Sequence, residues 1–512
     1  MAGSQRGETS ATHPSAVAMP FAPATADGVL AVDVGGGGVR AGVFGRDGSL
    51  RSLVSGPPPS DGEQFNPDWT WLAVAEAIRS LTSRRIQVRA VGVTTHLATT
   101  LTDAEGQPTT SAMLWRDNRA SQDARDLEAA LGPELRRVTG REASGESAAA
   151  RMRMLTRTSP ALLGRTRWLL SLKDYLVLKL TGAACTDTAS ASYTQLFDVR
   201  RRQWSPAIAQ ECGVPAAILP PTFPATTLAG RVTAAAALVT GLVPGTPVAV
   251  GGPDGSTGAL GVAAHQAGVT VDVAGTTDVL LHTADAAPEH QGPGVVLNAY
   301  LLPGLWTLGG PTGLTGGGLD WLAVTMGYQS AAAAYQALEP ALDAADPGDL
   351  MIRTTLTGRR LPGWDAGQRG RMEGLSAEHG PVHLLRAAEE GSIFEVRLGI
   401  DALRSGGTTV SQVILAGRPA TSARAAQLRA NAWGIRVGRD SDEYASLRGA
   451  ALAASVAGGY FADARQAATA LVAPLEWYQP EPAGAAAAEE RYQRWRSVMA
   501  APEVPRTAIA DL

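Results

Sequence analysis

Cysteine, lysine and long apolar runs are scarce in this chain of 512 residues. Its two cysteines, Cys185 and Cys212, are too few for a disulfide framework or a cysteine-based zinc site, so we expect both to be small buried residues in a reducing cytoplasm. No run approaches the ~18 apolar residues that a membrane-spanning helix requires. The sequence therefore predicts a cytoplasmic protein without a membrane partner.

Lysine is nearly absent as well, because Lys173 and Lys179 are the only two in the chain. The formal net charge is −4 and no basic block recurs on one face, which argues against nucleic acid or an anionic membrane as a partner. A 45% share of hydrophobic residues is that of an ordinary globular protein, and the length is that of about two or three domains. Residues 1–27 lack the basic region and apolar core of a signal peptide, and we expect a disordered N-terminal extension there.

From Gly28 onward, strand-like and helix-like patterns alternate, which indicates an α/β fold. Strands are predicted at 30–34, 39–44, 87–93, 98–102 and 247–252, with a strand–turn–strand at 269–281. Helices are predicted at 69–81, 168–180 and 485–498, and turns or mobile loops at 219–224 and 309–318. The second strand–turn–strand resembles the first, which favours two related halves that each present a hairpin to one shared cleft.

The most informative stretch, from Leu30 to Phe44, reads LAVDVGGGGVRAGVF. Its glycines allow backbone N–H groups to approach a ligand closely and to take positive φ, which suits a phosphate-binding turn. Asp33, at the end of the first strand, is placed to hold a cation or its waters. A strand follows and no lysine is present, so the stretch is neither a P-loop nor a dinucleotide turn. A glycine-rich surface hairpin is the alternative interpretation.

Six segments, in order, resemble motifs of the FGGY family of carbohydrate kinases, within the sugar kinase, Hsp70 and actin superfold. They are the first phosphate motif at 33–40, the Trp-x-Asp-x-Arg segment at 114–119, the catalytic aspartate loop at 251–255, the second phosphate motif at 275–277, and a C-terminal signature at 358–365 and 386–391. Each motif alone is weak, whereas their order over roughly residues 30–494 is specific.

The resemblance implies two actin-like (ribonuclease H-like) domains with a duplicated ββαβαβα core and a cleft between them. The N-terminal domain would span 28–262 and contain the acceptor side, the first phosphate loop and the catalytic aspartate. The C-terminal domain would span 263–500 and contain the second phosphate loop and the adenosine site. The oligomeric state stays open, with a homodimer among the options.

The resemblance also implies transfer of a phosphoryl group from ATP to a small neutral sugar, polyol or cyclitol, with Mg²⁺ as cofactor. Asp254 is the candidate general base, and a turn-capping aspartate is the alternative. Asp33 is expected to orient Mg²⁺ through water, with Asp254 beside it, and a strand-end cap is the alternative for Asp33. The residues expected to bind the nucleotide are Gly35, Gly36, Gly37, Gly38, Arg40, Gly275, Thr276, Gly316, Gly417, Arg418 and Thr421.

Two departures from the family pattern affect the nucleotide site. Gly36 stands where the first motif usually has threonine, which removes a hydroxyl that could touch phosphate or metal. Arg418 and Pro419 stand where the adenosine-side motif has small residues. An arginine there either stacks on adenine or reaches phosphate, or it narrows the site, changes the nucleotide or is merely solvated.

The acceptor pocket is atypical too; its candidate residues are His96, Leu97, Trp115, Asp117 and Asp254. Leu97 and Ala98 stand where glycerol kinases have an Arg-Glu pair, so glycerol is disfavoured. His96 either contacts an acceptor hydroxyl or is an ordinary buried histidine, and Trp115 either forms an apolar wall or belongs to the core. A pentulose such as xylulose is the default acceptor, and the less polar positions leave room for a cyclitol of a biosynthetic pathway.

Two other classes of protein remain as alternatives. A non-catalytic nucleotide- or sugar-sensing relative is favoured by the departures at Gly36 and Arg418, but disfavoured by the retained Asp33 and Asp254. An actin-like filament protein or an Hsp70-like chaperone would share the cleft. It is disfavoured because the segments 114–119 and 386–391 resemble those of sugar kinases.

Overall fold

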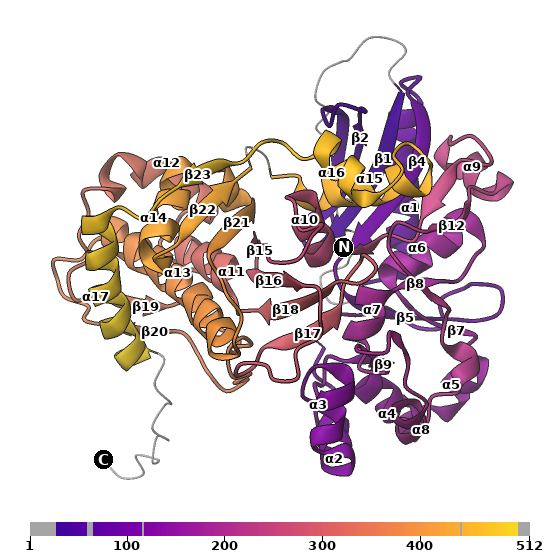
Figure 1. Ribbon diagram of the computed structural model, residues 1–512, viewed down its shortest axis with the longest axis horizontal. Helices are drawn as coiled ribbons and strands as arrows, with labels where there is room; N and C mark the ends of the chain where they lie inside the picture. Colours follow the sequence, from indigo (N-terminus) through magenta and orange to yellow (C-terminus); the bar gives the residue numbers. More distant parts are fainter. Residues whose placement is uncertain (1–26, 59–64, 115–116, 441–442, 500–512) are drawn as a thin grey trace, which may run out of the picture.

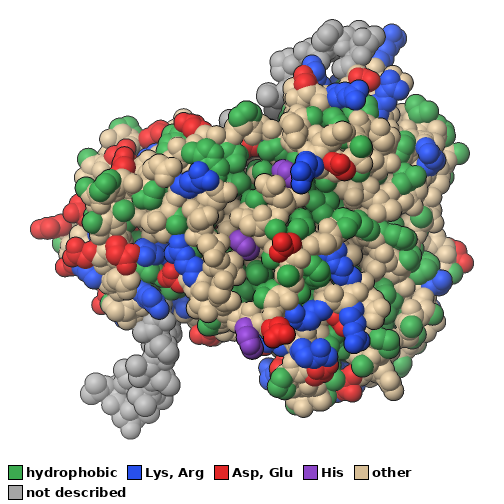
Figure 2. Space-filling view, in the orientation of Figure 1, with side chains coloured by type: hydrophobic (Ala, Val, Ile, Leu, Met, Phe, Trp, Pro, Cys, Tyr) green, Lys and Arg blue, Asp and Glu red, His purple; other side chains and the backbone are tan. Residues whose placement is uncertain are grey.

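The computed structural model describes residues 27–58, 65–114, 117–440 and 443–499, which form two lobes side by side (Figure 1). Each lobe contains a mixed sheet of seven strands. The predicted α/β class with two domains is therefore confirmed. Of the predicted N-terminal extension, only Asp27 lies within the described residues, and it is the first residue of a strand. Acidic and basic side chains are interspersed over the face of the molecule shown in Figure 2.

The first sheet has the strand order β12-β13-β4-β1-β2-β3, and β14 also pairs with β4. Its strands are β1 (Asp27–Gly35), β2 (Gly38–Phe44), β3 (Leu50–Gly56), β4 (Gln87–Thr95), β12 (Leu228–Arg231), β13 (Pro247–Ala249) and β14 (Gly252–Pro253). The strands β1, β2 and β3 form an antiparallel meander, whereas β4 and β13 extend the sheet in parallel to β1.

The second sheet, ordered β17-β18-β16-β15-β21-β22-β23, repeats this plan. Its strands are β15 (Thr270–Ala274), β16 (Val279–Ala284), β17 (Val296–Ala299), β18 (Trp306–Pro311), β21 (Gln412–Gly417), β22 (Arg436–Arg439) and β23 (Glu476–Tyr478). The hairpin β15–β16 is antiparallel, and β21 and β22 follow β15 in parallel, as β4 and β13 follow β1. The predicted relationship between the two halves is therefore visible in their strand order.

Helices and short strands surround the sheets. The helices are α1 (Pro67–Thr82), α2 (Ser121–Leu131), α3 (Pro133–Thr139), α4 (Ala148–Thr158), α5 (Pro160–Arg165), α6 (Leu172–Thr181), α7 (Thr188–Tyr193), α8 (Pro206–Glu211), η1 (Ala216–Ile218), α9 (Ala234–Thr240), α10 (Asp254–Gly261), α11 (Thr315–Thr325), α12 (Ala331–Leu342), α13 (Pro381–Ser405), η2 (Arg418–Thr421), α14 (Ala423–Trp433), α15 (Ala445–Ala457), α16 (Ala464–Leu471) and α17 (Pro482–Met499). The short strands are β5 (Ala98–Thr102), β6 (Met113–Leu114), β7 (Trp168–Ser171), β8 (Thr186–Asp187), β9 (Phe197–Asp198), β10 (Gln203–Trp204), β11 (Thr222–Phe223), β19 (Met351–Arg353) and β20 (Arg371–Glu373).

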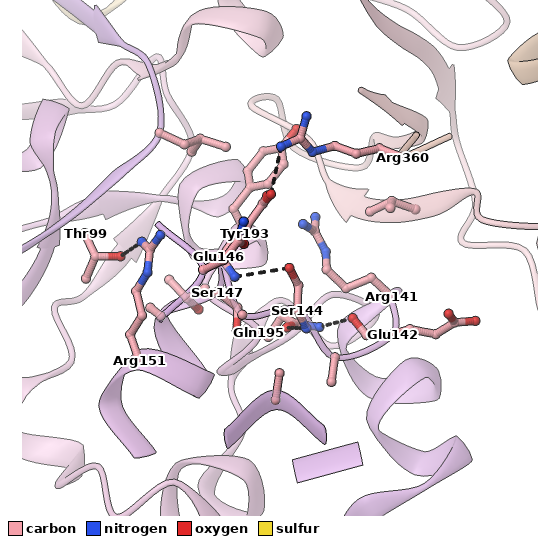
Figure 3. A pocket seen from close by; sticks show the side chains of 18 of the residues that line it. Thr99, Arg141, Glu142, Ser144, Glu146, Ser147, Arg151, Tyr193, Gln195 and Arg360 are labelled. Atoms are coloured by element: carbon pink, nitrogen blue, oxygen red, sulfur yellow. Dashed lines mark hydrogen bonds and ion pairs between the residues drawn. The ribbon is translucent and has the colours of Figure 1, made fainter. Parts of the chain in front are cut away.

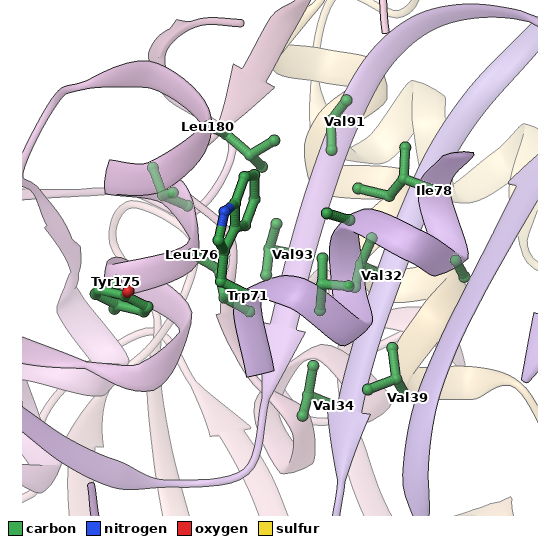
Figure 4. Packing of buried hydrophobic residues seen from close by; sticks show 14 of the residues in the cluster. Val32, Val34, Val39, Trp71, Ile78, Val91, Val93, Tyr175, Leu176 and Leu180 are labelled. Atoms are coloured by element: carbon green, nitrogen blue, oxygen red, sulfur yellow. The ribbon is translucent and has the colours of Figure 1, made fainter. Parts of the chain in front are cut away.

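Helix α1 shows how the sequence determines the first lobe. The Asn66 side chain caps the helix by accepting hydrogen bonds from the N–H groups of Asp68 and Trp69, and proline occupies the first turn, where its missing N–H has no cost. The apolar face of the helix, with Trp71 and Ile78, packs on valines of β1 and β4 (Figure 4). Complete burial of one such side chain stabilises the fold by about 1.5–3 kcal/mol.

Helices α10 and α15 lie between the two sheets and join their cores. One buried cluster contains Ala31 of β1, Val271 of β15 and Ala450 of α15. Glycine permits this close packing, because a Cβ at Gly92 of β4 would lie 2.1 Å from the carbonyl oxygen of Ala450. The two sheets therefore meet on a shared helical layer, and the ends of their strands border the same interlobe region.

Two local predictions were wrong. The segment predicted as a helix at 168–180 begins with the strand β7, and α6 starts only at Leu172, because Ser171 and Asp174 form a capping box there. The glycine-rich segment 309–318 is not a mobile loop, since Gly309 and Gly310 belong to β18 and residues 315–318 open α11. In the other predicted loop, 219–224, two residues form β11.

Both cysteines are buried as expected. Burial raises the pKa of Cys185 to about 11 and that of Cys212 to about 12, so neither thiol is reactive near neutral pH. None of the helices within the described ranges is both long and apolar enough to cross a membrane.

Candidate active site

The register of three parallel strands brings Asp33 and Asp254 to one edge of the first sheet. Asp33 of β1 is paired with Thr94 of β4, which in turn is paired with Gly252 of β14. Asp254 follows two residues later as the first residue of α10. The hydroxyls of Thr94 and Thr257 lie 2.7 Å apart and hold α10 on β4. Since the carboxyl ends of neighbouring parallel strands lie together, two aspartates that are distant in sequence border one site.

Nearby groups offset the negative charges of Asp33 and Asp254 only in part. Burial raises the pKa of Asp33 to about 6, although the guanidinium of Arg40, 4.0 Å away, acts in the opposite direction. Burial, and then the charge of Asp33, raise the pKa of Asp254 to about 7, and the Gly255 N–H donates to its Oδ1 at 2.7 Å. A carboxylate with a pKa near 7 is suited to accept a proton at neutral pH.

The environment of Asp33 also fits a hydrated cation. Within the described ranges, its Oδ1 is buried without a hydrogen-bond partner. No group of three or more His, Cys, Asp or Glu residues that could hold a metal ion is found in the same part of the chain. A cation at Asp33 would therefore keep most of its waters, which is the usual way in which Mg²⁺ is bound.

The first glycine turn borders open space. Gly35 pairs with Gly38, so Gly36 and Gly37 form the turn between β1 and β2. A Cβ at position 35, 36 or 37 would meet no atom within 4 Å, so packing does not require glycine there. Positive φ is confined to Gly38, at +136°, where a Cβ would lie 2.2 Å from the carbonyl oxygen of Gly56. The expected positive φ therefore holds for one of the four glycines, whereas the bare backbone of the other three leaves room for a ligand.

A second turn, residues 275–278, joins β15 to β16 and exposes Gly275 and Thr276. The first residues of α11 pack against this turn. The Asp278 N–H donates to Thr315 Oγ1 at 2.9 Å, and a Cβ at Gly316 would lie 2.0 Å from the carbonyl oxygen of Gly275. The positive end of a helix dipole therefore lies directly beneath the turn, which favours an anion such as phosphate.

The adenosine-side residues predicted from the sequence lie beside this second turn. Gly417 of β21 is paired with Ala274 of β15, and its φ of +85° and a Cβ position 2.1 Å from the Ala274 carbonyl oxygen both require glycine. Arg418 is exposed and begins η2, and the Thr421 hydroxyl donates to its carbonyl oxygen at 2.8 Å. The predicted nucleotide residues of the second lobe are therefore brought together.

A cavity of about 730 Å³ lies between the lobes, walled by α2, α4 and α7 on one side and by residues 357–366 on the other (Figure 3). The residues that line it include Leu97, Ala98, Thr99, Arg141, Glu146, Arg151, Tyr193 and Arg360. Tyr193 connects the cavity to the aspartates. Burial raises the pKa of Tyr193. The charge of Arg141 lowers it, the charge of Asp254 raises it, and a hydrogen bond with the Ser256 side chain lowers it.

Three predicted acceptor residues, His96, Asp117 and Asp254, are not among the residues that line this cavity. His96 is buried against Phe65, with ring centroids 4.8 Å apart, and its Nδ1 lies 3.0 Å from the carbonyl oxygen of Val34. These contacts agree with the alternative interpretation of His96, an ordinary buried histidine. Asp117 forms an ion pair with Arg119 at 2.6 Å, and this hydrogen-bonded guanidinium lowers its pKa. Trp115 lies outside the described residues, whereas Leu97 lines the cavity.

Sequence reasoning missed the charged residues of the cavity and Tyr193. The guanidinium of Arg141 stacks on the ring of Tyr193, 4.6 Å from its centroid, and Arg360 pairs with Glu146 at 2.8 Å across the two lobes. Arginine supplies nearly all the positive charge of the chain, so no single arginine stands out in the sequence. The sequence does show a glycine at position 140, directly before Arg141. In the structure its φ of +74° and its close approach to Leu297 bring residue 141 against the second lobe.

Two related sheets, a shared helical layer and a cleft bordered by paired aspartates and glycine turns define the class, a two-domain ATP-binding phosphotransferase. The chain belongs to the FGGY family of carbohydrate kinases. The model of the family's N-terminal domain matches residues 28–261, and that of its C-terminal domain matches residues 271–458. The chain is thus a carbohydrate kinase.

Similar proteins are named for more than one acceptor. The chain is 28% identical to xylulose kinase of Escherichia coli (strain K12) over 438 residues, which cover 84% of this chain and 90% of that protein. It is 29% identical to glycerol kinase of Nocardia farcinica over 401 residues, or 74% and 78% of the two chains. A crystal structure described as a xyloylose kinase from Brucella ovis matches with a TM-score of 0.80 at 25% identity, covering 92% and 98% of the chains. Overall similarity therefore does not select the acceptor.

Proposed function

We propose that this carbohydrate kinase transfers the γ-phosphoryl group of ATP to a hydroxyl of a small polyhydroxylated acceptor, with Asp254 as general base. The observation that carries the proposal is the position of Asp254 at the start of α10, partly open to the cleft, with a pKa of about 7. The hydroxyl oxygen forms a bond to the γ-phosphorus while its proton passes to the Asp254 carboxylate. The bond from that phosphorus to the β–γ bridging oxygen breaks, and ADP leaves with the electron pair.

The donor is proposed to lie between the two glycine turns. Residues 35–38 and Arg40 would approach the phosphates from the first lobe, and Gly275, Thr276 and Gly316 from the second. The adenosine would lie over Gly417, Arg418 and Thr421. Mg²⁺, when bound, neutralises phosphate charge; we propose that Asp33 holds it through water, with Asp254 beside it.

For the acceptor, a pentulose such as xylulose is the default neutral candidate and a cyclitol is the alternative. Identity to xylulose kinases supports the first. The apolar Leu97 and Ala98 in the cavity wall support an acceptor other than glycerol, because they offer no hydrogen bonds to a triol.

We also propose a domain boundary at 262–263, directly after α10, and the cytoplasm as the site of action, since ATP is the donor. The oligomeric state, with a homodimer as one option, is measured by size-exclusion chromatography with light scattering.

The proposal is tested by ADP release from ATP and Mg²⁺ over a panel of pentuloses, polyols and cyclitols, with the product position read by NMR. We expect acceptor-dependent ADP release that Asp254→Asn reduces about 10²–10⁴-fold. Asp285→Asn, a change of an exposed aspartate, is the matched control and should leave the rate unchanged. ATP binding without ADP release for any acceptor would instead favour the non-catalytic sensor, the second candidate suggested by Gly36 and Arg418.

A further inference from the structure

We propose that the acceptor carries a carboxylate, bound by Arg141 at the end of the cavity away from the phosphorylated hydroxyl. The substrate class would then be a small polyhydroxylated acid rather than a neutral sugar. This inference rests on the proposed kinase function and adds the chemical identity of the acceptor's second end.

Arg141 is an arginine whose donors are mostly unused. Throughout the described part of the chain, the only acceptor for its guanidinium is Asn298 Oδ1, which takes a hydrogen bond from Nη2, and its buried Nε has no partner. Burial lowers the pKa of Arg141 to about 10, so its surroundings disfavour the charge that it carries. An anion at this position would supply the missing acceptors and compensate the charge.

The guanidinium is directed at the cavity and not at the protein interior. Figure 3 shows Arg141 projecting toward Arg360 and Glu146, with Tyr193 beside them. The central carbon of the guanidinium lies over the Tyr193 ring, 4.6 Å from its centroid. A guanidinium held over a ring in this way can still donate hydrogen bonds from its edges. The Tyr193 side chain also reaches the Asp254–Ser256 region. The Arg141 guanidinium and the segment that begins with Asp254 are therefore both close to one tyrosine side chain, which suits an acceptor of a few carbons.

Several other charged groups of the cavity have more protein partners than Arg141, although the buried Nε of Arg151 also has none among the described residues. Glu146 is paired with Arg360, and Arg359 with Glu395 at 3.1 Å. Arg151 donates to Thr99 Oγ1 at 3.2 Å and to the backbone carbonyl of Met113 at 2.8 Å. No ion pair to Arg141 is found within the described residues, although the nearby charge of Glu146 acts to raise its pKa.

One planar anion with a single charge matches this arrangement best. A guanidinium offers two parallel N–H donors that fit the two oxygens of a carboxylate, and the single charge of Arg141 balances one negative charge. A phosphate monoester would bring close to two negative charges and would meet Glu146 as well. The observations therefore favour a sugar acid over a sugar phosphate.

The test compares acceptors of equal chain length that differ at one end: aldonic acids, the corresponding alditols, and the corresponding terminal phosphates. With the wild-type full chain, ATP and Mg²⁺, we expect kcat/KM for an aldonic acid to exceed that for its alditol at least tenfold. Arg141→Gln should lower kcat/KM for the acid about 100-fold, because one partner of an enclosed charge pair is removed. Arg141→Lys, which keeps the charge but loses the fork, should recover part of the loss.

Arg125→Gln is the matched control, since Arg125 also borders the cavity but is exposed and donates to Gln122. It should leave kcat/KM for the acid unchanged, and thermal melting of each variant checks its folding. Calorimetric binding of the aldonic acid to Asp254→Asn, with and without Arg141→Gln, adds a readout that needs no turnover, and only the single variant should bind.

The outcomes separate this inference from the proposed function. Turnover of alditols or pentuloses with no advantage for acids, or equal loss for acid and alditol in Arg141→Gln, overturns the carboxylate while the kinase stands. Stronger binding of the terminal phosphate than of the acid overturns it too. Absence of ADP release with every acceptor refutes the proposed function, and calorimetry still decides whether Arg141 binds a carboxylate.

Discussion

The hydroxyls of Thr94 and Thr257 lie 2.7 Å apart in the interior of the molecule, and this contact joins β4 to the helix that begins with Asp254. Both side chains are completely buried. The same register places Thr94 opposite Asp33. One buried hydrogen bond thus lies between the two aspartates of the cleft and fixes their separation.

Thr257→Val should therefore destabilise the protein by about 1–3 kcal/mol, because it leaves the Thr94 hydroxyl buried without this partner. It should also lower kcat, since α10 is less firmly held on β4. Urea unfolding and ADP release measure the two effects. Thr100→Val is the control: the Thr100 hydroxyl has no partner among the described residues, so its loss should be neutral or stabilising. Equal stability changes in both variants would contradict the assignment.

The rate should depend on pH through Asp254. A general base acts when it is ionised, so kcat/KM should fall about tenfold per pH unit below the pKa of about 7 and level off above it. Removing the neighbouring charge by Asp33→Asn should lower the pKa of Asp254. An NMR titration of labelled carboxyl groups in the metal-free protein measures this shift directly, and an unchanged pKa in Asp33→Asn would show that the two aspartates do not interact.

Stability should move in the opposite direction from activity in Asp254→Asn. The folded-state pKa of Asp254 lies above its ordinary value, so its contribution to stability is complete at low pH and is lost as the pH rises through about 7. Asparagine does not ionise, so the variant does not lose this stability as the pH rises. We expect the variant to melt at a higher temperature than the wild type at pH 8, by calorimetry without Mg²⁺, and at a similar temperature near pH 4. A lower melting temperature of the variant at pH 8 would show that ionised Asp254 does not destabilise the folded protein.

The four glycines after Asp33 should respond differently to substitution. Gly36→Thr adds the hydroxyl that the family resemblance led us to expect there, and a Cβ at this position meets no atom within 4 Å, so the fold should be unchanged or slightly more stable. Gly38→Ala should be destabilising, because its φ is +136° and the Gly56 carbonyl blocks the Cβ. Melting temperatures and the KM for ATP are the measurements. If the added hydroxyl reaches phosphate, KM for ATP should fall in Gly36→Thr, whereas an increase would mean that the turn requires bare backbone.

Local patterns predicted much of the first lobe. The apolar runs around Asp33 became β1 and β2, and helical spacing with Asn66 and Pro67 produced α1. The errors arose where one local signal competed with another. At 168–180 the capping box at Ser171 and Asp174 outweighed apolar spacing, and at 309–310 strand pairing with β16 used glycines that resemble a loop.

The sequence by itself determined the family, because several short motifs follow one another in the family's order along most of the chain, and it made Asp254 the candidate base. Only the tertiary structure showed that the charge of Asp33 raises the pKa of Asp254, that His96 is buried against Phe65, and that Arg141 borders the cavity with a buried Nε that has no partner among the described residues. Those features depend on strand register and on contact between lobes, which join residues more than a hundred positions apart. No pattern along the chain reports such contacts, since burial and charge compensation exist only once the two lobes have come together.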